Sequence, residues 1–540
     1  MTKLLAKALL IVACLAAARG AAARGKVDCA WGYTDERYSE PGQFPRSKDV
    51  KPSIELSAWR GERVNAQLVA VNLGQDSVEA SFSVSPPRDN VSIRAGWVED
   101  VLADSFCDCA SHDIDEFGKR LTPDRISREH RRLIAPQAAR GAWLTLFVPQ
   151  DIEAGTYEGS VSVSLGGEEF TLPYQLRVVD RVLPPACEWG FHLDLWQNPY
   201  AVARYHGVQP WSDEHLELMR PLMEELASAG QKVVTATLTA RPWNSQTEDP
   251  FGSMVTWIKR ADGSWLYDFT VFDRWVEFMA SCGIDQQINC YSMIPWRLSF
   301  EYFDQATNSL QELSCAPGEE AYDDFWGGML RELARHLEAK GWLSKTCIAM
   351  DERQPEQMRK AMDLIHSAAP GLGISLAGNY HPDIEAELRD YCVDISQLDG
   401  LPTEVIERRR GDKLVTTFYT CCSCERPNTF TFSPPAEAEL LPLLAAAHGL
   451  DGYLRWAFNS WTLEPAVDSR FRSWPSGDCY IVYPNSETSI RWERLVEGIQ
   501  QVEKWRLLGG EQKLIAPLAQ PQPLPSLQRR LRQLHTNLNR

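Results

Sequence analysis

Two adjacent carboxylates, Asp351 and Glu352, are the residues of this chain best placed to do chemistry. They follow the short apolar run 347–350, which has the character of a buried strand. In a parallel α/β barrel the carboxyl ends of the strands carry the active-site loops, so acids delivered there favour a catalytic role. The alternative is a helix start, because Pro355 follows closely and acidic residues favour the first turn of a helix.

Aromatic and amide side chains follow the other expected strands in the same half of the chain. A sugar presents an apolar ring face and a rim of hydroxyl groups, so its site needs aromatic platforms beside hydrogen-bonding amides and acids. A single aromatic residue is more often part of a core, and it is the recurrence at strand ends that indicates a site. We expect substrate contacts from Trp196, Trp243, Gln246, Tyr291, Trp296, Asn379, Tyr419, Trp456, Asn459 and Trp461.

The adjacency of the two acids constrains the mechanism. Glycoside hydrolysis usually requires two carboxyls that flank the scissile bond, but successive side chains of a strand leave opposite faces. In a 2-acetamido sugar the amide oxygen of the substrate can act as the nucleophile. Glu352 would then be the general acid/base, and Asp351 would orient and stabilise the acetamido group. The residues leave open a two-carboxylate mechanism whose second acid is Asp194, Asp394 or Glu425.

The chain changes its pattern near Pro184 and Pro185. Short alternating segments with Gly and Pro punctuation predict an antiparallel β-sandwich over 26–185. Apolar strands that alternate with helical segments then predict a (β/α)8 barrel over 186–506. An open doubly wound sheet is the alternative, but no glycine-rich nucleotide fingerprint follows the first strand. The expected barrel strands are 190–195, 232–238, 285–291, 346–350, 373–377, 392–396, 413–419 and 452–456, and 507–540 is expected to be a peripheral tail.

Charge and the amino-terminal residues limit the class of protein. A net charge of -18 over 540 residues argues against binding to nucleic acid. Residues 1–23 have the pattern of a signal peptide, which predicts a secreted or periplasmic protein. Lipoprotein anchoring through Cys14 is the less favoured alternative. No later stretch reaches the length of a membrane span, and the sequence does not indicate an oligomeric state.

Cysteines cluster in two short motifs, CDC at 107–109 and CCSC at 421–424. Neither motif has the second half of a known zinc-binding spacing. Buried or paired thiols are therefore favoured over a metal site, because free cysteine is among the most buried residue types. Neither a metal nor an organic cofactor is expected.

The segment IAMDE, which carries Asp351 and Glu352, and the long block 449–499 resemble glycoside hydrolase family 123. The resemblance covers about 29–505 and is more specific in the barrel half. It implies a β-sandwich followed by a barrel, β-N-acetylgalactosaminidase activity, and a retaining, substrate-assisted mechanism whose Asp–Glu pair falls on Asp351 and Glu352. The expected function is removal of a terminal β-linked N-acetylgalactosamine from a glycan. The rivals are a glycosidase that acts on another hexoside with two protein carboxylates, and a non-catalytic carbohydrate-binding protein.

Overall fold

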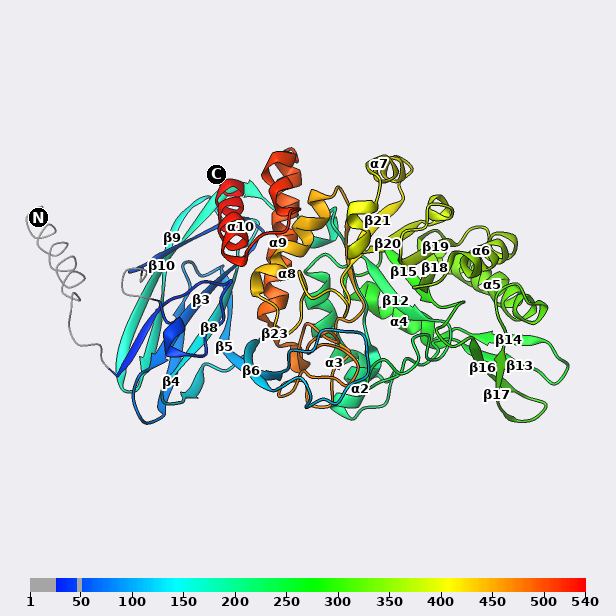
Figure 1. Cartoon of the computed structure of the whole chain (residues 1–540), viewed down its shortest axis with the longest axis horizontal. Helices are drawn as coiled ribbons and strands as arrows, with labels where there is room; N and C mark the ends of the chain where they lie inside the picture. Colours follow the sequence, from blue (N-terminus) through cyan, green and yellow to red (C-terminus); the bar gives the residue numbers. More distant parts are fainter. Residues whose placement is uncertain (1–25, 46–50) are drawn as a thin grey trace, which may run out of the picture. The chain divides into compact units, whose positions relative to one another are not determined.

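The chain forms two compact units in a computed structural model that describes residues 26–45 and 51–540 (Figure 1). The first unit contains the described residues up to Asp100, Thr122–Leu183 and the last two residues. The second contains Val101–Leu121 and Pro184–Leu538. The segment 101–121, which the sequence assigned to the sandwich, therefore belongs to the unit with the barrel. The expected signal peptide, 1–23 with Cys14, lies outside the described residues.

The first unit is the expected β-sandwich. Its strands run in the orders β1-β3-β8-β5-β6 and β2-β10-β9-β4-β7, and only β10 and β2 pair in parallel among the strand pairs described there. Leu68 and Leu144 of one sheet and Val161 and Leu176 of the other are fully buried in one shared core. The strands are β1 (Val27–Trp31), β2 (Ile54–Arg60), β3 (Arg63–Asn72), β4 (Val78–Ser85), β5 (Ser92–Ala103), β6 (Arg120–Ile126), β7 (Arg131–Ile134), β8 (Ala138–Phe147), β9 (Gly155–Leu165) and β10 (Glu168–Val182).

The second unit contains the expected barrel of eight parallel strands. They run in the order β11-β22-β21-β20-β19-β18-β15-β12, so chain neighbours are also neighbours in space around most of the ring. The short apolar runs form these strands because both of their faces are buried, one in the barrel interior and one under the helices. The strands are β11 (His192–Leu195), β12 (Val233–Thr237), β15 (Gln287–Tyr291), β18 (Thr346–Asp351), β19 (Gly373–Gly378), β20 (Asp390–Asp394), β21 (Val415–Tyr419) and β22 (Gly452–Arg455).

Side-chain amides close the ring between β11 and β12, where one isolated bridge stands in place of a ladder. Gln231 accepts a hydrogen bond from the Leu195 amide at 2.9 Å and donates one to the Val233 carbonyl at 2.8 Å. Gln197 accepts from the Thr235 amide at 2.9 Å and also donates to Val233, at 3.2 Å. The two side-chain amides thus pair with buried backbone N–H and C=O groups that would otherwise lack a partner, because β11 and β12 do not form a ladder with each other.

Helices cover the outside of the barrel, as Figure 1 shows for α4 to α7. Helical segments expected between the barrel strands become α3, α4, α5, α6 and α8. The first four each bury one apolar face, whereas α8 is buried almost all round. The helices are α2 (Pro199–His206), α3 (Asp213–Ala227), α4 (Thr270–Ser281), α5 (Glu320–Lys340), α6 (Pro355–Ala368), α7 (Thr403–Gly411), α8 (Pro435–Ala447), α9 (Ile490–Leu507) and α10 (Leu524–Leu538).

A four-stranded sheet that the sequence did not predict is inserted into the barrel. Two hairpins, one after β12 and one after β15, pair in the order β14-β13-β16-β17. Trp257 of this sheet stacks on Phe325 of α5 with ring centroids 4.4 Å apart, which attaches the insertion to the helical layer. The strands are β13 (Thr256–Lys259), β14 (Trp265–Asp268), β16 (Ser299–Asp304) and β17 (Ser309–Ser314), and a two-residue strand, β23 (Thr488–Ser489), precedes α9.

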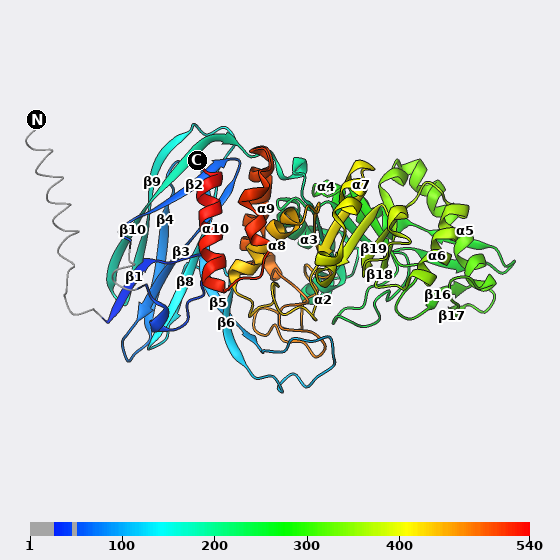
Figure 2. The ribbon, with the colours of Figure 1, turned by 45° about the horizontal axis from the view of Figure 1, so that its top comes forward.

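The carboxyl-terminal region is more than a peripheral tail. Helix α10 packs on α8 and α9, and Figures 1 and 2 both show it beside α9. Its residues Leu527, Leu531 and Leu534 lie on one face and are buried. The sequence indicates a possible final helix from Ser526, and α10 lies there, but the proline and glutamine residues before it give no sign of its packing on α8 and α9.

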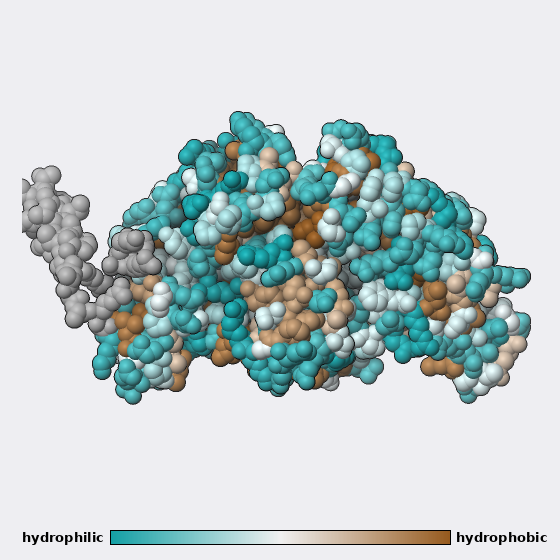
Figure 3. Space-filling view, viewed as in Figure 1, coloured by the Kyte–Doolittle hydropathy of each residue, from teal (hydrophilic) through white to brown (hydrophobic). Residues whose placement is uncertain are grey.

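The surface is mostly polar on the face drawn in Figure 3, with apolar residues in small patches. This agrees with the strong excess of acidic residues. Within 26–45 and 51–540, no helix has both the length and the apolar character that a bilayer crossing requires.

Strand β22 contacts β11 so closely at Gly452 that only glycine fits. A Cβ built on Gly452 would lie 1.8 Å from the His192 carbonyl oxygen, a backbone atom that cannot move without breaking the pairing of the two strands. Gly452→Ala should therefore lower the free energy of unfolding by about 2 kcal/mol or more. Chemical denaturation of both proteins measures this difference.

The matched control is Gly411→Ala at the end of α7, where an added Cβ meets nothing within 4 Å. That variant should keep or slightly raise the stability, because alanine is the better helix former. Equal stability of Gly452→Ala and the wild type would show that β22 and β11 do not approach each other closely at Gly452.

Candidate active site

Asp351 and Glu352 lie at the carboxyl end of β18 and both line one cavity. On a regular strand one of them would face away from the other. Glu352 instead adopts a left-handed backbone conformation with φ of 52°, although its amide still donates to the Ala377 carbonyl of β19 at 2.7 Å. The change of backbone direction brings both side chains to the same cavity. Non-glycine residues rarely adopt this conformation, and such strain is concentrated at functional sites.

The cavity has a volume of about 560 Å³ and opens at the carboxyl ends of the strands. Residues that follow all eight barrel strands contribute to its wall, which is the arrangement expected of an active site in this fold. The wall is formed by Trp196, Gln246, Trp296, the run from Asp351 to Gln354, Ala377, Asn379, His381, Asp394, Ser396, Tyr419, Cys421, Cys422, Ser423, Leu454, Trp456 and Trp474, together with Cys109.

Hydrogen bonds orient each acid separately. The indole N–H of Trp296, after β15, donates to Oδ2 of Asp351 at 3.2 Å. The hydroxyl of Tyr419, at the end of β21, donates to Oε1 of Glu352 at 3.1 Å. Arg353 lies over the Trp296 ring, 5.9 Å from its centroid. The two carboxyls are therefore held by donors that belong to two different strands or to the loops that follow them.

Burial and a neighbouring charge both change the pKa of Asp351. Burial, and then the charge of Glu352, raise the pKa of Asp351 from 3.8 to about 8, against the opposing effects of Arg353, Trp296 and Trp243. Burial and then the charge of Glu352 also raise the pKa of Tyr419, so its hydroxyl stays a donor. At neutral pH folded Asp351 therefore largely retains its proton.

Buried ionic contacts fix the loops on the far side of the cavity. Arg455 of β22 pairs with Asp478 at 2.6 Å, and both side chains are completely buried. Asp478 also accepts the indole N–H of Trp456 at 2.9 Å, and Arg455 donates to Asn428 at 2.6 Å. Because the charges are paired and hydrogen-bonded, they are tolerated inside the protein and hold Trp456 in the cavity wall.

Most of the substrate contacts expected from the sequence lie in or next to the cavity. Trp243 lines a neighbouring cavity and stacks on Trp196 with ring centroids 4.8 Å apart. The residues that line the catalytic cavity itself are Trp196, Gln246, Trp296, Asn379, Tyr419 and Trp456.

Three of the expected contacts line neither the catalytic cavity nor its neighbour, so the structure does not place them as substrate contacts. Tyr291 is buried behind the aromatic wall, 4.7 Å from Trp196 between ring centroids. Asn459 uses its amide to hold the backbone of Asn198, accepting from its N–H and donating to its carbonyl, both at 2.9 Å. Trp461 is buried and donates its indole N–H to the Val482 carbonyl at 2.9 Å. The polar groups of Asn459 and Trp461 are therefore already hydrogen-bonded inside the protein.

Of the three alternative partner acids, only Asp394 lines the cavity. Asp194 is buried within β11, where burial and the charge of Asp390 raise its pKa well above the ordinary value. Glu425 is exposed and does not contribute to the cavity wall. A mechanism with two separated carboxylates would therefore have to use Asp394.

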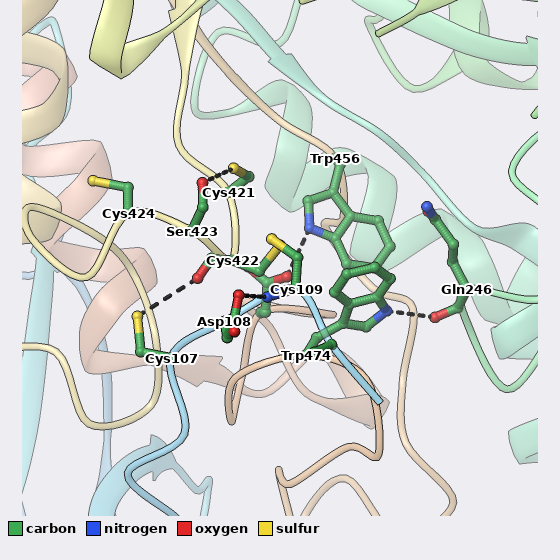
Figure 4. Close-up of a disulfide and its surroundings, with 12 residues drawn as sticks. Cys107, Asp108, Cys109, Gln246, Cys421, Cys422, Ser423, Cys424, Trp456 and Trp474 are labelled. Carbon is green, nitrogen blue, oxygen red and sulfur yellow. Dashed lines mark hydrogen bonds between the residues drawn. A yellow bond between two sulfur atoms is a disulfide. The ribbon is translucent and has the colours of Figure 1, made fainter. Parts of the chain in front are cut away.

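A disulfide at the cavity rim was not predicted. Cys109 of the segment 101–121 is bonded to Cys422, which lies after β21 and 313 residues further along the chain (Figure 4). Cys421 completes the one group of three possible metal ligands within the described residues, but two of its three sulfur atoms are bonded to each other. The cysteine motifs gave the signal for paired thiols, whereas their separation in the chain concealed the pairing. The wall residue Trp474 carried no such local signal.

Family models match both units of the chain. The catalytic-domain model of glycoside hydrolase 123 matches 196–508, and the N-terminal-domain model of the same family matches 31–165. None of the curated proteins matches the chain.

Among solved structures, the chain is similar to a family 123 glycoside hydrolase from Clostridium perfringens, from a study of glycolipid glycan hydrolysis. The TM-score is 0.86 and the identity 24%, over 95% of this chain and 97% of that one. The PapD-like domain 7 of human CEP192 (TM-score 0.17, 12% identity, 30% and 94% covered) and a FixG-related protein from Vibrio parahaemolyticus (0.16, 10%, 29% and 100%) are too distant to support an argument. With both family domains matched over most of its length, this chain belongs to glycoside hydrolase family 123.

Proposed function

We propose that this glycoside hydrolase removes terminal β-linked N-acetylgalactosamine from glycans, and that the 2-acetamido group of the substrate is the nucleophile. The observation that carries the proposal is that Asp351 and Glu352 are adjacent and line the same cavity. Two carboxyls so close cannot flank a glycosidic bond from opposite sides, as the usual mechanisms require. They can serve two neighbouring parts of one sugar, the glycosidic oxygen and the acetamido N–H.

The reaction then has two steps. Glu352 donates its proton to the glycosidic oxygen as the acetamido oxygen attacks the anomeric carbon and the bond to the leaving group breaks. Asp351 accepts a hydrogen bond from the acetamido N–H, which becomes more acidic as positive charge develops in the oxazolinium ring. Glu352 next removes a proton from water, which opens the ring with net retention of configuration. The positive charge that develops in the oxazolinium ring opposes the raised pKa of Asp351 and favours its ionised form.

The sugar and the location of the enzyme are also part of the proposal. Trp196, Trp296, Trp456 and Trp474 supply apolar surfaces, and Asn379 and Gln246 supply amides, in a cavity large enough for a sugar. The resemblance to family 123 favours N-acetylgalactosamine, and the Clostridium perfringens relative is connected with glycolipid glycans. The leader-like residues 1–23 and the Cys109–Cys422 disulfide support export to an oxidising compartment.

The first test replaces the proposed proton donor. Glu352→Gln keeps the shape of the side chain and its contact with Tyr419 but removes the acid, so kcat/KM for an unactivated glycan should fall roughly 100-fold to 10,000-fold. An aryl glycoside with a good leaving group needs less protonation and should lose less in the first step. Steady-state kinetics with both substrates measure the difference, and unchanged turnover of the glycan would remove Glu352 from this role.

The second test concerns the acetamido group. Asp351→Asn should weaken the charge-assisted hydrogen bond to the acetamido N–H and lower kcat by about 100-fold or more. Its rate should also respond differently when the N-acetyl group of an aryl substrate is replaced by N-trifluoroacetyl. If the variant and the wild type show the same ratio of rates for the two substrates, Asp351 does not contact this group.

A third test uses the cost of holding the two acids together. Between about pH 4, where an unfolded aspartate titrates, and about pH 8, folded Asp351 retains a proton that the unfolded chain loses. The folded state binds more protons in this window, so the free energy of unfolding falls as pH rises, and the full loss is present above about pH 8. Asp351→Asn cannot titrate and should therefore gain about 1–3 kcal/mol of stability relative to the wild type between pH 4 and pH 8.

Urea denaturation of both proteins at pH 5 and pH 8 measures this relative gain. A stability difference that is the same at both pH values would show that folded Asp351 does not retain its proton.

A further inference from the structure

The disulfide at the cavity rim connects two parts of the substrate-binding wall. Cys109 and Cys422 both line the catalytic cavity, and Figure 4 shows them beside Trp456 and Trp474. Cys109 is exposed in the segment 101–121, whereas Cys422 is buried in the loop after β21. The bond therefore attaches an outer segment to an inner loop at the edge of the site.

The wall formed by this segment continues beyond the catalytic cavity. A second cavity of about 260 Å³ shares Cys109, Gln246, Trp296 and Trp474 with the first. Residues 109–111 also line this second cavity, opposite aromatic and amide side chains. A monosaccharide held at Glu352 would occupy the catalytic cavity alone. A longer glycan that extends from the catalytic cavity into the second cavity would contact residues 109–111.

Hydrogen bonds hold the segment at both ends but not at its tip. Near its start, the Leu102 amide donates to the Val467 carbonyl at 2.8 Å, and the Asp104 amide donates to the Ser476 hydroxyl at 2.9 Å. After the tip, the His112 amide donates to the Arg472 carbonyl at 2.9 Å. For residues 109–111, the covalent bond from Cys109 to Cys422 is the strongest connection to the rest of the unit.

We propose that the Cys109–Cys422 disulfide positions residues 109–111 as a specificity-determining wall, so that recognition of substrates longer than a monosaccharide depends on the closed bond. This inference rests on the proposed glycosidase function. The disulfide touches no reacting atom and acts through the segment that it holds. Its opening should change the selectivity between long and short substrates more than it changes the chemistry at Glu352.

A dithiol reductant opens the bond in two balanced steps. One thiolate of the reagent attacks Sγ of the exposed Cys109, forms a mixed disulfide and releases Cys422, which takes up a proton. The second thiol of the reagent then displaces Cys109, which is also protonated, and the reagent leaves as a cyclic disulfide. Cys421 lies within 4.8 Å of both sulfur atoms, but burial raises its pKa to about 11, so at neutral pH it is a thiol and exchanges slowly.

The experiment compares two substrates on the full-length enzyme: an aryl β-N-acetylgalactosaminide and an oligosaccharide of three or four sugars that ends in β-N-acetylgalactosamine. Cys109→Ser should lower the ratio of kcat/KM for the oligosaccharide to that for the aryl glycoside about ten-fold, mainly through a higher KM for the oligosaccharide. Dithiothreitol should produce the same change in the wild type, reoxidation should reverse it, and the variant should not respond. The matched control is Cys107→Ser, two residues away and outside both cavities. The Cys107 thiol donates to the Cys422 carbonyl at 3.5 Å, and a serine hydroxyl can keep this contact, so the variant should keep the wild-type ratio.

Two further readouts make the outcome decisive. Thiol alkylation followed by mass spectrometry reports whether the bond is open, and trypsin should cleave faster after Lys119 or Arg120 when it is. An unchanged substrate ratio in protein whose bond is shown to be open would overturn the proposal. If the wild type hydrolyses neither substrate, the proposed function fails, and calorimetric binding of the oligosaccharide to the oxidised and reduced protein decides the positioning role. In that case, equal affinity of the oxidised and reduced protein for the oligosaccharide, or no binding to either form, would overturn the positioning role of the disulfide.

Discussion

The active site depends on the backbone of one residue. Glu352 follows Asp351 directly, and its left-handed conformation is what allows both carboxyls to line one cavity. The neighbouring strand accommodates this turn: the Ala377 carbonyl accepts the Glu352 amide, and a Cβ on Gly378 would approach the Glu352 Cα to 3.3 Å. The conformation is costly, and so is the proximity of the two acids, which raises the pKa of Asp351. A rigid surrounding structure must therefore maintain both.

The barrel provides that rigidity through contacts that differ around the ring. Backbone ladders join most neighbouring strands, and the amides of Gln197 and Gln231 replace the ladder where β11 meets β12. The buried Arg455–Asp478 pair fixes the wall around Trp456, and Trp296 and Tyr419 orient the two acids from separate strands. Because donors on different strands hold neighbouring carboxyls, the separation of the acids is set by the whole barrel rather than by one loop.

The parts of this arrangement that are local in the chain could be predicted from the sequence. The eight barrel strands lie in short apolar segments, and the segment of β18 already indicates a buried strand that ends in two acids, Asp351 and Glu352. The sequence could not predict which side chains after a strand point into the cavity. Trp461 and Asn459 have the same residue types as residues of the cavity wall, and only packing directs them into the protein interior. The Cys109–Cys422 bond depends on a contact between segments 313 residues apart, and the inserted sheet depends on pairing between two distant hairpins. Neither leaves a local pattern.

The central claim is that the acetamido group of the substrate, and not a protein carboxylate such as Asp394, attacks the anomeric carbon. The most direct measurement is the inhibition constant of N-acetylgalactosamine-thiazoline, a stable analogue of the oxazolinium intermediate. Substrate assistance predicts competitive inhibition at least about 100-fold tighter than that by N-acetylgalactosamine itself, because the site would be complementary to the cyclised ring. A thiazoline that binds no more tightly than the parent sugar would contradict the account and favour a mechanism that uses Asp394.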